Sequence, residues 1–280
     1  MGAVSSPDFL VIVHVTKDLF PESQAIGGTA TYSALTAKAL GRRVGVITSA
    51  APDYDPEGAL QGIEIICVPS PCTTTFRNIY LDGERRQFIL AQALPIEAES
   101  VPLAWRQAVI VHLGPVAQEV DIELARLFPH SLKGLTPQGL LRRWDERGQV
   151  SIGAREGLEE FFSSIDVLIF SREDVAGDVR LVEKFSQLSP ICVLTQGREG
   201  ATVFQRNGGR HFPAQLAKVV DPTGAGDVFA ASYLVKLAED GDPYQAARFA
   251  NCAASLVIQQ PGIAGIPTRE EIERRLIEKS

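Results

Sequence analysis

Short apolar runs alternate with amphipathic stretches along most of the chain. The apolar runs are rich in β-branched residues and predict buried strands at 9–15, 44–49, 108–114, 166–170 and 191–195. Helices are predicted between them, including 27–41, which glycines open and close, and the amphipathic stretch 119–128. Strands that are apolar along their whole length and separated by helices indicate a mostly parallel sheet covered on both faces. We therefore expect a three-layer α/β fold.

Two segments break this rhythm with the period-2 alternation of half-exposed strands. Apolar and polar residues alternate in 75–81 and in 85–90, which lie on either side of Asp82-Gly83. This dipeptide is typical of tight hairpin turns. Residues 201–206 and 210–214 flank Asn207-Gly208-Gly209 and predict a second hairpin. The first hairpin predicts a small antiparallel unit appended to the main sheet. No long linker divides the chain, so we expect one domain over 1–280.

Composition and charge narrow the functional classes. The 280 residues carry 27 Lys+Arg against 34 Asp+Glu, a net charge of −7, and 45% are hydrophobic, which excludes a disordered chain. The acidic balance argues against a nucleic-acid partner, because a phosphate backbone needs a basic face. No apolar run approaches a membrane span, and the first residues lack a signal-peptide pattern. The four cysteines form no C-x-x-C pair, so we expect reduced thiols in a cytoplasmic protein with no membrane partner.

The segment 218–240 carries the clearest chemistry. We expect 218–220 to end a strand, a turn to follow, and Asp227 to lie in the first turn of an amphipathic helix that Gly241 ends. Free N–H groups at a helix start next to glycines form an anion site. A carboxylate held there can take a proton from a hydroxyl while the N–H groups stabilise a transferred phosphoryl group. The alternative is a glycine-rich helix cap without chemistry.

The run Asp-Pro-Thr-Gly-Ala-Gly-Asp at 221–227 resembles the signature of the ribokinase-like (PfkB) family of carbohydrate kinases. Two further landmarks occur in order: Gly27-Gly28 before a helix ending in Leu40-Gly41, and a C-terminal stretch, 251–276, whose closing helix starts with a Thr268/Glu271 capping box. The resemblance covers nearly the whole chain and reaches the myo-inositol-kinase-like branch.

This resemblance implies a ribokinase-like fold with a β-sheet lid formed discontinuously by about 16–25 and 63–92. It also implies an ATP-dependent kinase that phosphorylates a hydroxyl of a small sugar or polyol. A nucleoside kinase of the same family and a catalytically silent nucleotide-binding regulator are the alternatives. The lid can serve as a dimer clasp in the family, so a homodimer through the lid is expected here.

The resemblance assigns roles at matching positions. Asp227 is the expected general base, and the expected anion hole is Gly224, Ala225 and Gly226. The expected substrate contacts are Asp18, Gly27, Gly28 and Tyr32. The expected nucleotide contacts are Thr195, Gly197, Thr223, Asn251 and Ala254. Mg²⁺ is expected to arrive with ATP and to be held through water by Glu173 or Asp174, and Asp221 is the candidate for a monovalent cation such as K⁺.

The chain departs from the family pattern at some of these positions. His14 stands where the first strand usually ends in Gly, and Tyr32 stands where Asn is usual. Residues 171–174, Ser-Arg-Glu-Asp, replace an N-x-x-E motif that organises metal-bound water. The departures fall at acceptor and metal positions, whereas the Asp227 region is intact.

Other side chains have two interpretations each. Arg77, Arg85 and Arg86 in the predicted lid face either the substrate or solvent. Arg142 belongs to a stretch, 134–144, that resembles inositol-kinase-like relatives: it either contacts phosphate, or the stretch is a turn followed by a solvated helix. His112 ends a predicted strand, where ligands gather in open α/β sheets, and is either catalytic or a core side chain.

Overall fold

The computed structural model of the chain describes residues 6–20, 23–55, 58, 60–81, 84–153 and 157–278. In this part of the chain a nine-stranded sheet forms the centre, parallel except for two antiparallel strands at one edge. In spatial order its strands are β15 (Gly208–Phe212), β14 (Ala201–Gln205), β13 (Ile191–Thr195), β12 (Val167–Ser171), β9 (Leu132–Leu135), β8 (Ile110–Leu113), β1 (Phe9–Ile12), β4 (Val44–Ala50) and β5 (Glu64–Pro69). The predicted strands and the second predicted hairpin, β14–β15, are confirmed.

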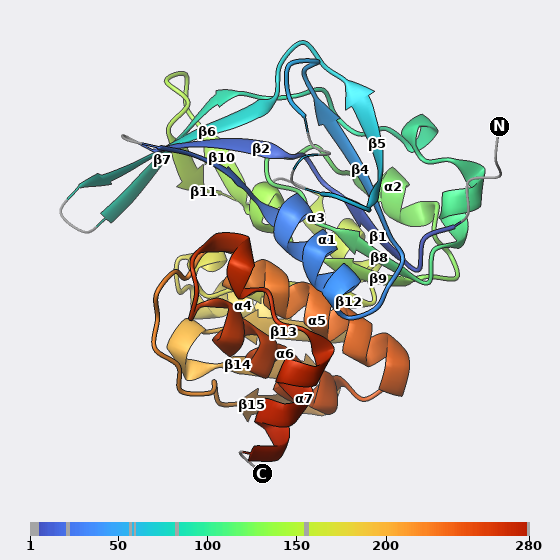
Figure 1. Cartoon of the computed structure of the whole chain (residues 1–280), viewed down its shortest axis with the longest axis vertical. Coiled ribbons are helices and arrows are strands. Elements are labelled where there is room, and N and C mark those ends of the chain that lie inside the picture. Colours follow the sequence, from blue (N-terminus) through green and yellow to red (C-terminus); the bar gives the residue numbers. More distant parts are fainter. Residues whose placement is uncertain are drawn as a thin grey trace.

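Helices cover both faces of this sheet, as the continuous apolar strands predict. Along β1, Phe9 and Val11 pack into one hydrophobic cluster and Leu10 and Ile12 into another on the opposite face. The helices of the first face are α1 (Thr29–Ala39), α5 (Ala225–Asp240), α6 (Pro243–Val257) and α7 (Arg269–Glu278), and those of the second are α2 (Ile122–Arg126), α3 (Leu158–Ser163) and α4 (Val179–Phe185). Figure 1 shows α5 to α7 in orange and red in front of the strands. The three-layer fold is confirmed.

A separate four-stranded sheet forms the appended unit, which we call the lid. Its order is β3 (Ser23–Gly27), β2 (Thr16–Phe20), β6 (Thr74–Leu81) and β7 (Glu84–Ala91). The β6–β7 pair is antiparallel, as predicted, and its hairpin projects from the body in Figure 1. The predicted turn, Asp82-Gly83, lies outside the described residues.

The predicted lid segment 63–92 starts too early. Strand β5 pairs in parallel with β4 and therefore belongs to the main sheet. An edge strand of a covered sheet is half exposed and alternates like a lid strand, so the pattern alone did not separate the two cases. A further small hairpin, β10 (Arg142–Trp144) with β11 (Val150–Ile152), lies beside β7 in place of the helix considered after residue 141.

Strand β1 ends at Ile12, before the predicted residue 15, because side chains take over its hydrogen bonds. The N–H of His14 donates to Glu119 Oε1 at 2.9 Å, and the N–H of Val15 donates to Thr48 Oγ1 at 2.7 Å. Glu119 is itself buried and also accepts from backbone N–H groups at 116 and 117. These bonds turn the chain out of the sheet and into the lid.

Three predicted ranges also need correction. Helix α1 starts at Thr29, after Gly28, whose φ is +85°. Helix α2 covers only the middle of 119–128, because Asp121 caps its first turn. Residues 218–220 form no strand, since the N–H groups of Val220 and Asp221 donate to the carbonyl of Ile258 after α6.

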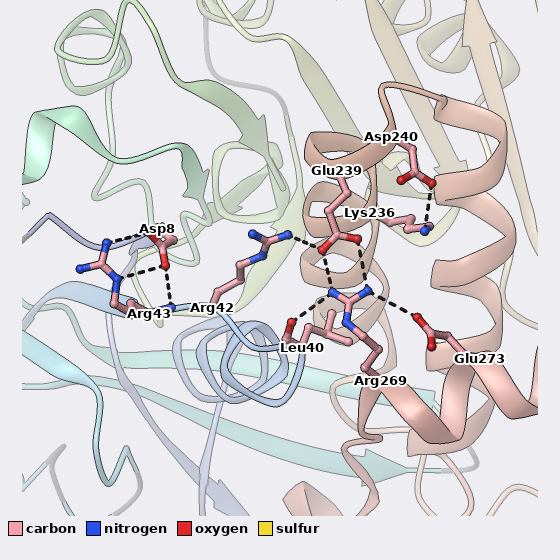
Figure 2. A network of polar contacts seen from close by, with 9 residues as sticks. All are labelled: Asp8, Leu40, Arg42, Arg43, Lys236, Glu239, Asp240, Arg269 and Glu273. Atoms are coloured by element: carbon pink, nitrogen blue, oxygen red, sulfur yellow. Dashed lines mark hydrogen bonds and ion pairs between the residues drawn. The ribbon is translucent and has the colours of Figure 1, made fainter.

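A polar network fastens the C-terminal helix to the body (Figure 2). Glu239, near the end of α5, pairs with Arg42 and accepts from both terminal nitrogens of Arg269 on α7 at 2.7 and 3.2 Å. Arg269 also donates to the carbonyl of Leu40 at 3.1 Å, which closes the end of α1. The side chains of Arg42, Glu239 and Arg269 are each about a quarter exposed. One carboxylate therefore joins α1, α5 and α7.

Replacing Glu239 with alanine should lower the free energy of unfolding by about 1–3 kcal/mol, because two half-buried guanidinium groups lose their partner. Urea denaturation followed by circular dichroism measures this. The matched control is Asp240→Ala, which removes only the i,i+4 pair with Lys236 and should cost less than about 0.5 kcal/mol. Equal effects of the two substitutions would contradict the role of the network.

Candidate active site

The start of α5 is a glycine-rich turn of the kind that can bind an anion, and we call it the anion turn. Gly224 has a φ of +76° and caps the helix, so the N–H groups of the first helical turn have no carbonyl partner within it. Asp221 supports the turn: its carboxylate oxygens accept from the N–H of Thr223 at 2.9 Å and the N–H of Gly262 at 2.8 Å. Burial opposes ionisation of Asp221, but these hydrogen bonds hold its pKa below the ordinary value. Each oxygen thus accepts from one backbone donor, which fixes the Asp221 carboxylate in the turn.

Asp227 is the third residue of α5 and lies beside this turn. Burial raises its pKa to about 6, a hydrogen bond from Thr29 at the start of α1 lowers it, Asp174 raises it and Arg142 lowers it. A carboxyl with this pKa is largely ionised at neutral pH and still basic enough to accept a proton from a hydroxyl. The helix start also favours its anionic form.

Tyr32 packs underneath the anion turn. A Cβ on Gly224 would lie 2.2–2.4 Å from three ring carbons of Tyr32, so the ring rests directly on the glycine. Burial raises the pKa of Tyr32 to about 12, with further contributions from the Asp221 and Asp227 carboxylates. The side chain is only 3% exposed, which leaves little surface for the substrate contact expected at this position. Its visible role is to support the turn.

The inner face of the lid presents a row of polar side chains. Asp18 on β2 accepts from Thr16 Oγ1 and from Asn78 Nδ2, both at 3.2 Å, and Gln87 Nε2 donates to Asn78 Oδ1 at 3.0 Å. A Cβ on Gly28 would lie 2.8 Å from Thr16 Oγ1, so this glycine allows the close approach, while Gly27 ends β3. The sequence named Asp18, Gly27 and Gly28 as candidates for this region but not Asn78 and Gln87. Asn78 lies two residues after the buried Phe76 on β6, so the period-2 pattern places both on the same face, and Gln87 is paired with Asn78 across the hairpin.

The structure separates the arginine candidates. Arg77 alternates with Phe76 and Asn78, lies on the outer face of the lid and stacks on Phe88 at 5.6 Å. Arg86 is exposed, and the side chain of Arg85 lies outside the described residues. Arg142, in contrast, stacks on Phe76 at 5.8 Å and lies close enough to Asp227 to lower the pKa of that carboxyl.

His112 fits the core interpretation. It is fully buried, and its Nε2 lies 3.0 Å from Thr136 Oγ1. Burial lowers its pKa to about 4, so the ring is neutral at physiological pH.

A pocket of about 570 Å³ lies at the ends of β12 and β13. Its lining residues are Ser171, Arg172, Glu173, Ala176, Gly177, Thr195, Gln196 and Gly197. Two of the expected nucleotide contacts, Thr195 and Gly197, therefore meet the expected metal-site residue Glu173 here. In open α/β sheets the carboxyl ends of parallel strands are the usual ligand edge.

Asp174 is fixed at the border between this pocket and Asp227. Its Oδ2 accepts from the N–H and the hydroxyl of Ser171 at 2.7 and 2.8 Å, and Gln138 donates to Oδ1 at 3.3 Å. In the described part of the chain no group of three or more His, Cys, Asp or Glu side chains is placed to hold a metal ion. Asp174 and Glu173 nevertheless fit Mg²⁺, which keeps several waters and needs only one or two carboxylates.

The remaining expected nucleotide contacts lie on other elements. Asn251 is buried on α6, and its Nδ2 donates to the carbonyls of Phe212 and Pro213 at 3.0 and 3.4 Å. Only the Oδ1 of Asn251 is left to accept a hydrogen bond from a nucleotide base. Ala254 is half-buried on the same helix, and Thr223 is exposed in the anion turn.

Among the described residues we find no helix that could span a membrane.

The sequence is similar to known kinases. A family profile described as pfkB family carbohydrate kinase matches residues 142–269, which include the anion turn and Asp227. Over 254 residues the chain is 25% identical to a cytidine kinase of Thermococcus kodakarensis, covering 81% of this chain and 87% of that protein.

The fold is also similar to solved structures. A pyrophosphate-dependent kinase in the ribokinase family, solved as a sulfate complex, matches with a TM-score of 0.79 and 22% identity, covering 95% of this chain and 99% of that one. The ribokinase of Arabidopsis thaliana, solved with ribose and ATP, matches with a TM-score of 0.75 and 21% identity over 97% and 99% of the two chains.

Proposed function

We propose that this chain, which belongs to the pfkB family of carbohydrate kinases, transfers the γ-phosphoryl group of ATP to a hydroxyl of a small sugar or polyol. The observation that carries the proposal is the pairing of Asp227 with the open anion turn at the start of α5. A carboxyl with a raised pKa beside the N–H groups of a helix start suits deprotonation of a hydroxyl next to a phosphoryl group, although the N–H of Ala225 must first leave the carbonyl of Pro222, to which it donates at 3.3 Å. A nucleoside acceptor and a catalytically silent, nucleotide-binding regulator are the alternatives.

In this proposal each group has a defined task. The hydroxyl gives its proton to Asp227 and attacks phosphorus, while the N–H groups of residues 224–226 stabilise the charge on the transferred group. Asp18, held by Thr16 and Asn78, accepts hydrogen bonds from neighbouring acceptor hydroxyls. Mg²⁺ supplies charge neutralisation on the donor phosphates, and Asp174 with Glu173 would hold it, directly or through water. A closed lid would keep water from replacing the acceptor.

The pocket that Thr195 and Gly197 line supports a nucleotide donor. Pyrophosphate is the alternative donor, because a similar kinase is described as pyrophosphate-dependent. Sugars and nucleosides are both candidate acceptors, because the similar proteins include a cytidine kinase and ribokinases. Asn78 is buried and holds Asp18 and Gln87 in place, and these two half-buried side chains offer an acceptor and an amide to a molecule with several neighbouring hydroxyls.

The deciding experiment is a donor and acceptor panel. Purified protein is incubated with Mg²⁺ and either ATP or pyrophosphate, against sugars, myo-inositol and other cyclic polyols, and nucleosides including cytidine. Phosphorylated product is identified by mass spectrometry and by the phosphorus resonance of a phosphate ester. Product from ATP and a polyol or sugar supports the proposal. Measurable ATP binding without product from any acceptor would favour the silent regulator.

The value of kcat/KM should fall on the acid side of about pH 6. Below the pKa of Asp227 the carboxyl is protonated and cannot accept the hydroxyl proton, so kcat/KM should decrease tenfold per pH unit. A measurement of kcat/KM against pH, with far-UV circular dichroism at each pH, tests this. A flat kcat/KM between pH 5 and 8 in folded protein would exclude Asp227 as the titrating base.

Three further properties stay proposals. We propose that the protein is cytoplasmic and that K⁺ binds backbone oxygen near Asp221 and Thr223. A homodimer through the lid would use β3 or the outer face, because Ile89 on β7 already pairs with the chain's own β10–β11 hairpin. Sedimentation velocity measures the dimer, and activity in Na⁺ against K⁺ tests the cation.

A further inference from the structure

The β10–β11 hairpin is fastened to the lid at its tip. The N–H of Ile89 on β7 donates to the carbonyl of Gly148 at 2.8 Å, and Phe88 forms an antiparallel bridge with Gln149. Gly148 has a φ of +77°, and a Cβ there would lie 2.2 Å from the carbonyl oxygen of Ile89. Only glycine fits this junction without moving the lid strand. Figure 1 shows β10 and β11 beside β7.

The base of the same hairpin holds Arg142 at the active site. The Arg142 guanidinium stacks on the ring of Phe76, a buried residue of lid strand β6, at 5.8 Å. Gln118 holds the Arg142 backbone by donating to its carbonyl at 2.6 Å. The positive charge of Arg142 is also near enough to Asp227 to lower the pKa of that carboxyl. The hairpin thus touches the lid at both ends and carries a cation to the catalytic carboxylate.

We propose that the β10–β11 hairpin moves with the lid, and that Arg142 is a further catalytic residue which reaches the transferred phosphoryl group when the lid closes. The proposal rests on the proposed function. Phosphoryl transfer concentrates negative charge between donor and acceptor oxygens. Asp227 and Asp174 add two carboxylates there, so a guanidinium that binds phosphate oxygens bidentately would offset charge that N–H groups alone leave unbalanced.

Tryptophan fluorescence reports the hairpin without any need for turnover. The chain has two tryptophans: Trp105 is 1% exposed, whereas Trp144 on β10 is half-buried. Iodide should therefore quench Trp144 selectively. Adding a non-hydrolysable ATP analogue together with each candidate acceptor of the panel in turn should reduce this quenching for an acceptor that binds, because closure covers the hairpin. Unchanged quenching with both ligands bound would overturn the coupling.

Gly148→Ala tests the junction. The added Cβ meets the carbonyl of Ile89 in a left-handed backbone, so the tip should detach from β7. The ligand-dependent change in Trp144 quenching should disappear, and kcat should fall about 10-fold or more as Arg142 loses its placement. The matched control is Gly41→Ala, because Gly41 has a similar φ of +85° and no atom within 4 Å of an added Cβ. This variant should keep the Trp144 response and the wild-type kcat. A normal response in Gly148→Ala would overturn the coupling.

Arg142→Gln tests the chemistry. It should keep the Trp144 response but lower kcat by about 10²–10³-fold, the usual worth of one electrostatic contact to the transition state. The acid limb of the kcat/KM profile should move to higher pH, because removal of the cation raises the pKa of Asp227. Normal kcat in folded Arg142→Gln would overturn the catalytic role. A wild-type Trp144 response without product from any acceptor would instead count against the proposed kinase function alone.

Discussion

Asp227→Asn should turn over about 10²–10⁴-fold more slowly than the wild type, the usual contribution of a general base. Asparagine has the same shape and can still accept a hydrogen bond from Thr29, but it cannot take the hydroxyl proton. The KM for ATP should change little, because the anion turn is untouched. Steady-state kinetics with the acceptor identified in the panel measures both constants.

We expect Asp227→Asn to be at least as stable as the wild type at neutral and alkaline pH, so a loss of turnover would not come from unfolding. The pKa of Asp227 rises from 3.8 to about 6 on folding, so the folded state binds its proton more tightly than the unfolded state. The ionised carboxylate therefore costs stability above pH 6, and this cost disappears as the pH falls toward 4. Asparagine removes it, so the Tm of Asp227→Asn at pH 8 should equal or exceed that of the wild type.

Two outcomes would contradict this role. One is near-normal turnover in folded Asp227→Asn, which would mean that another group accepts the proton of the acceptor hydroxyl. The other is an equal loss in Asp240→Asn, the matched control at the opposite end of α5, which lies far along the helix from the turn. Asp240 contacts only Lys236 among the ion pairs of α5 and should leave kcat unchanged.

The main sheet was predictable because each of its inner strands is buried on both faces. A strand such as β13 is apolar along its length for that reason, and its predicted bounds match the structure. The small hairpin β10–β11 escaped prediction because it has three residues per strand and polar side chains, Arg142 and Arg143, in one of them. Its structure depends on the lid strand beside it, which no local pattern encodes.

The candidate site also has a part that the sequence indicates and a part that only tertiary contacts bring together. Asp227 and the anion turn could be proposed as candidates from the sequence, because the turn, the glycines and the helix start are adjacent in the chain. Asn78 and Arg142 depend on strand register and on contacts between segments far apart in the chain. Tyr32 was expected to touch substrate, yet α1 packs on α5 and buries its ring under Gly224. Burial of this kind follows from tertiary packing and leaves no signature in a single sequence.

Gly224→Ala should lower kcat by about 10²–10³-fold, comparable to the loss of an oxyanion-hole donor. The substitution strains a backbone with φ +76° and places a Cβ 2.2 Å from the Tyr32 ring. The ring is enclosed by α1 and α5 and cannot move away, so the turn must shift instead. Its N–H groups then no longer point at the transferred phosphoryl group. The control is Gly241→Ala at the other end of α5.

Gly241 has a φ of +68° and no atom within 4 Å of an added Cβ, so alanine there costs only backbone strain, about 1 kcal/mol. Comparable Tm losses with a large kcat difference would locate the effect at the turn itself. The double variant Gly224→Ala/Tyr32→Ala separates the two causes, because it removes the clash and keeps the strain. Partial recovery of kcat is expected if the ring contact matters. Equal kcat in Gly224→Ala and Gly241→Ala would instead mean that the open turn is a helix cap without a catalytic task.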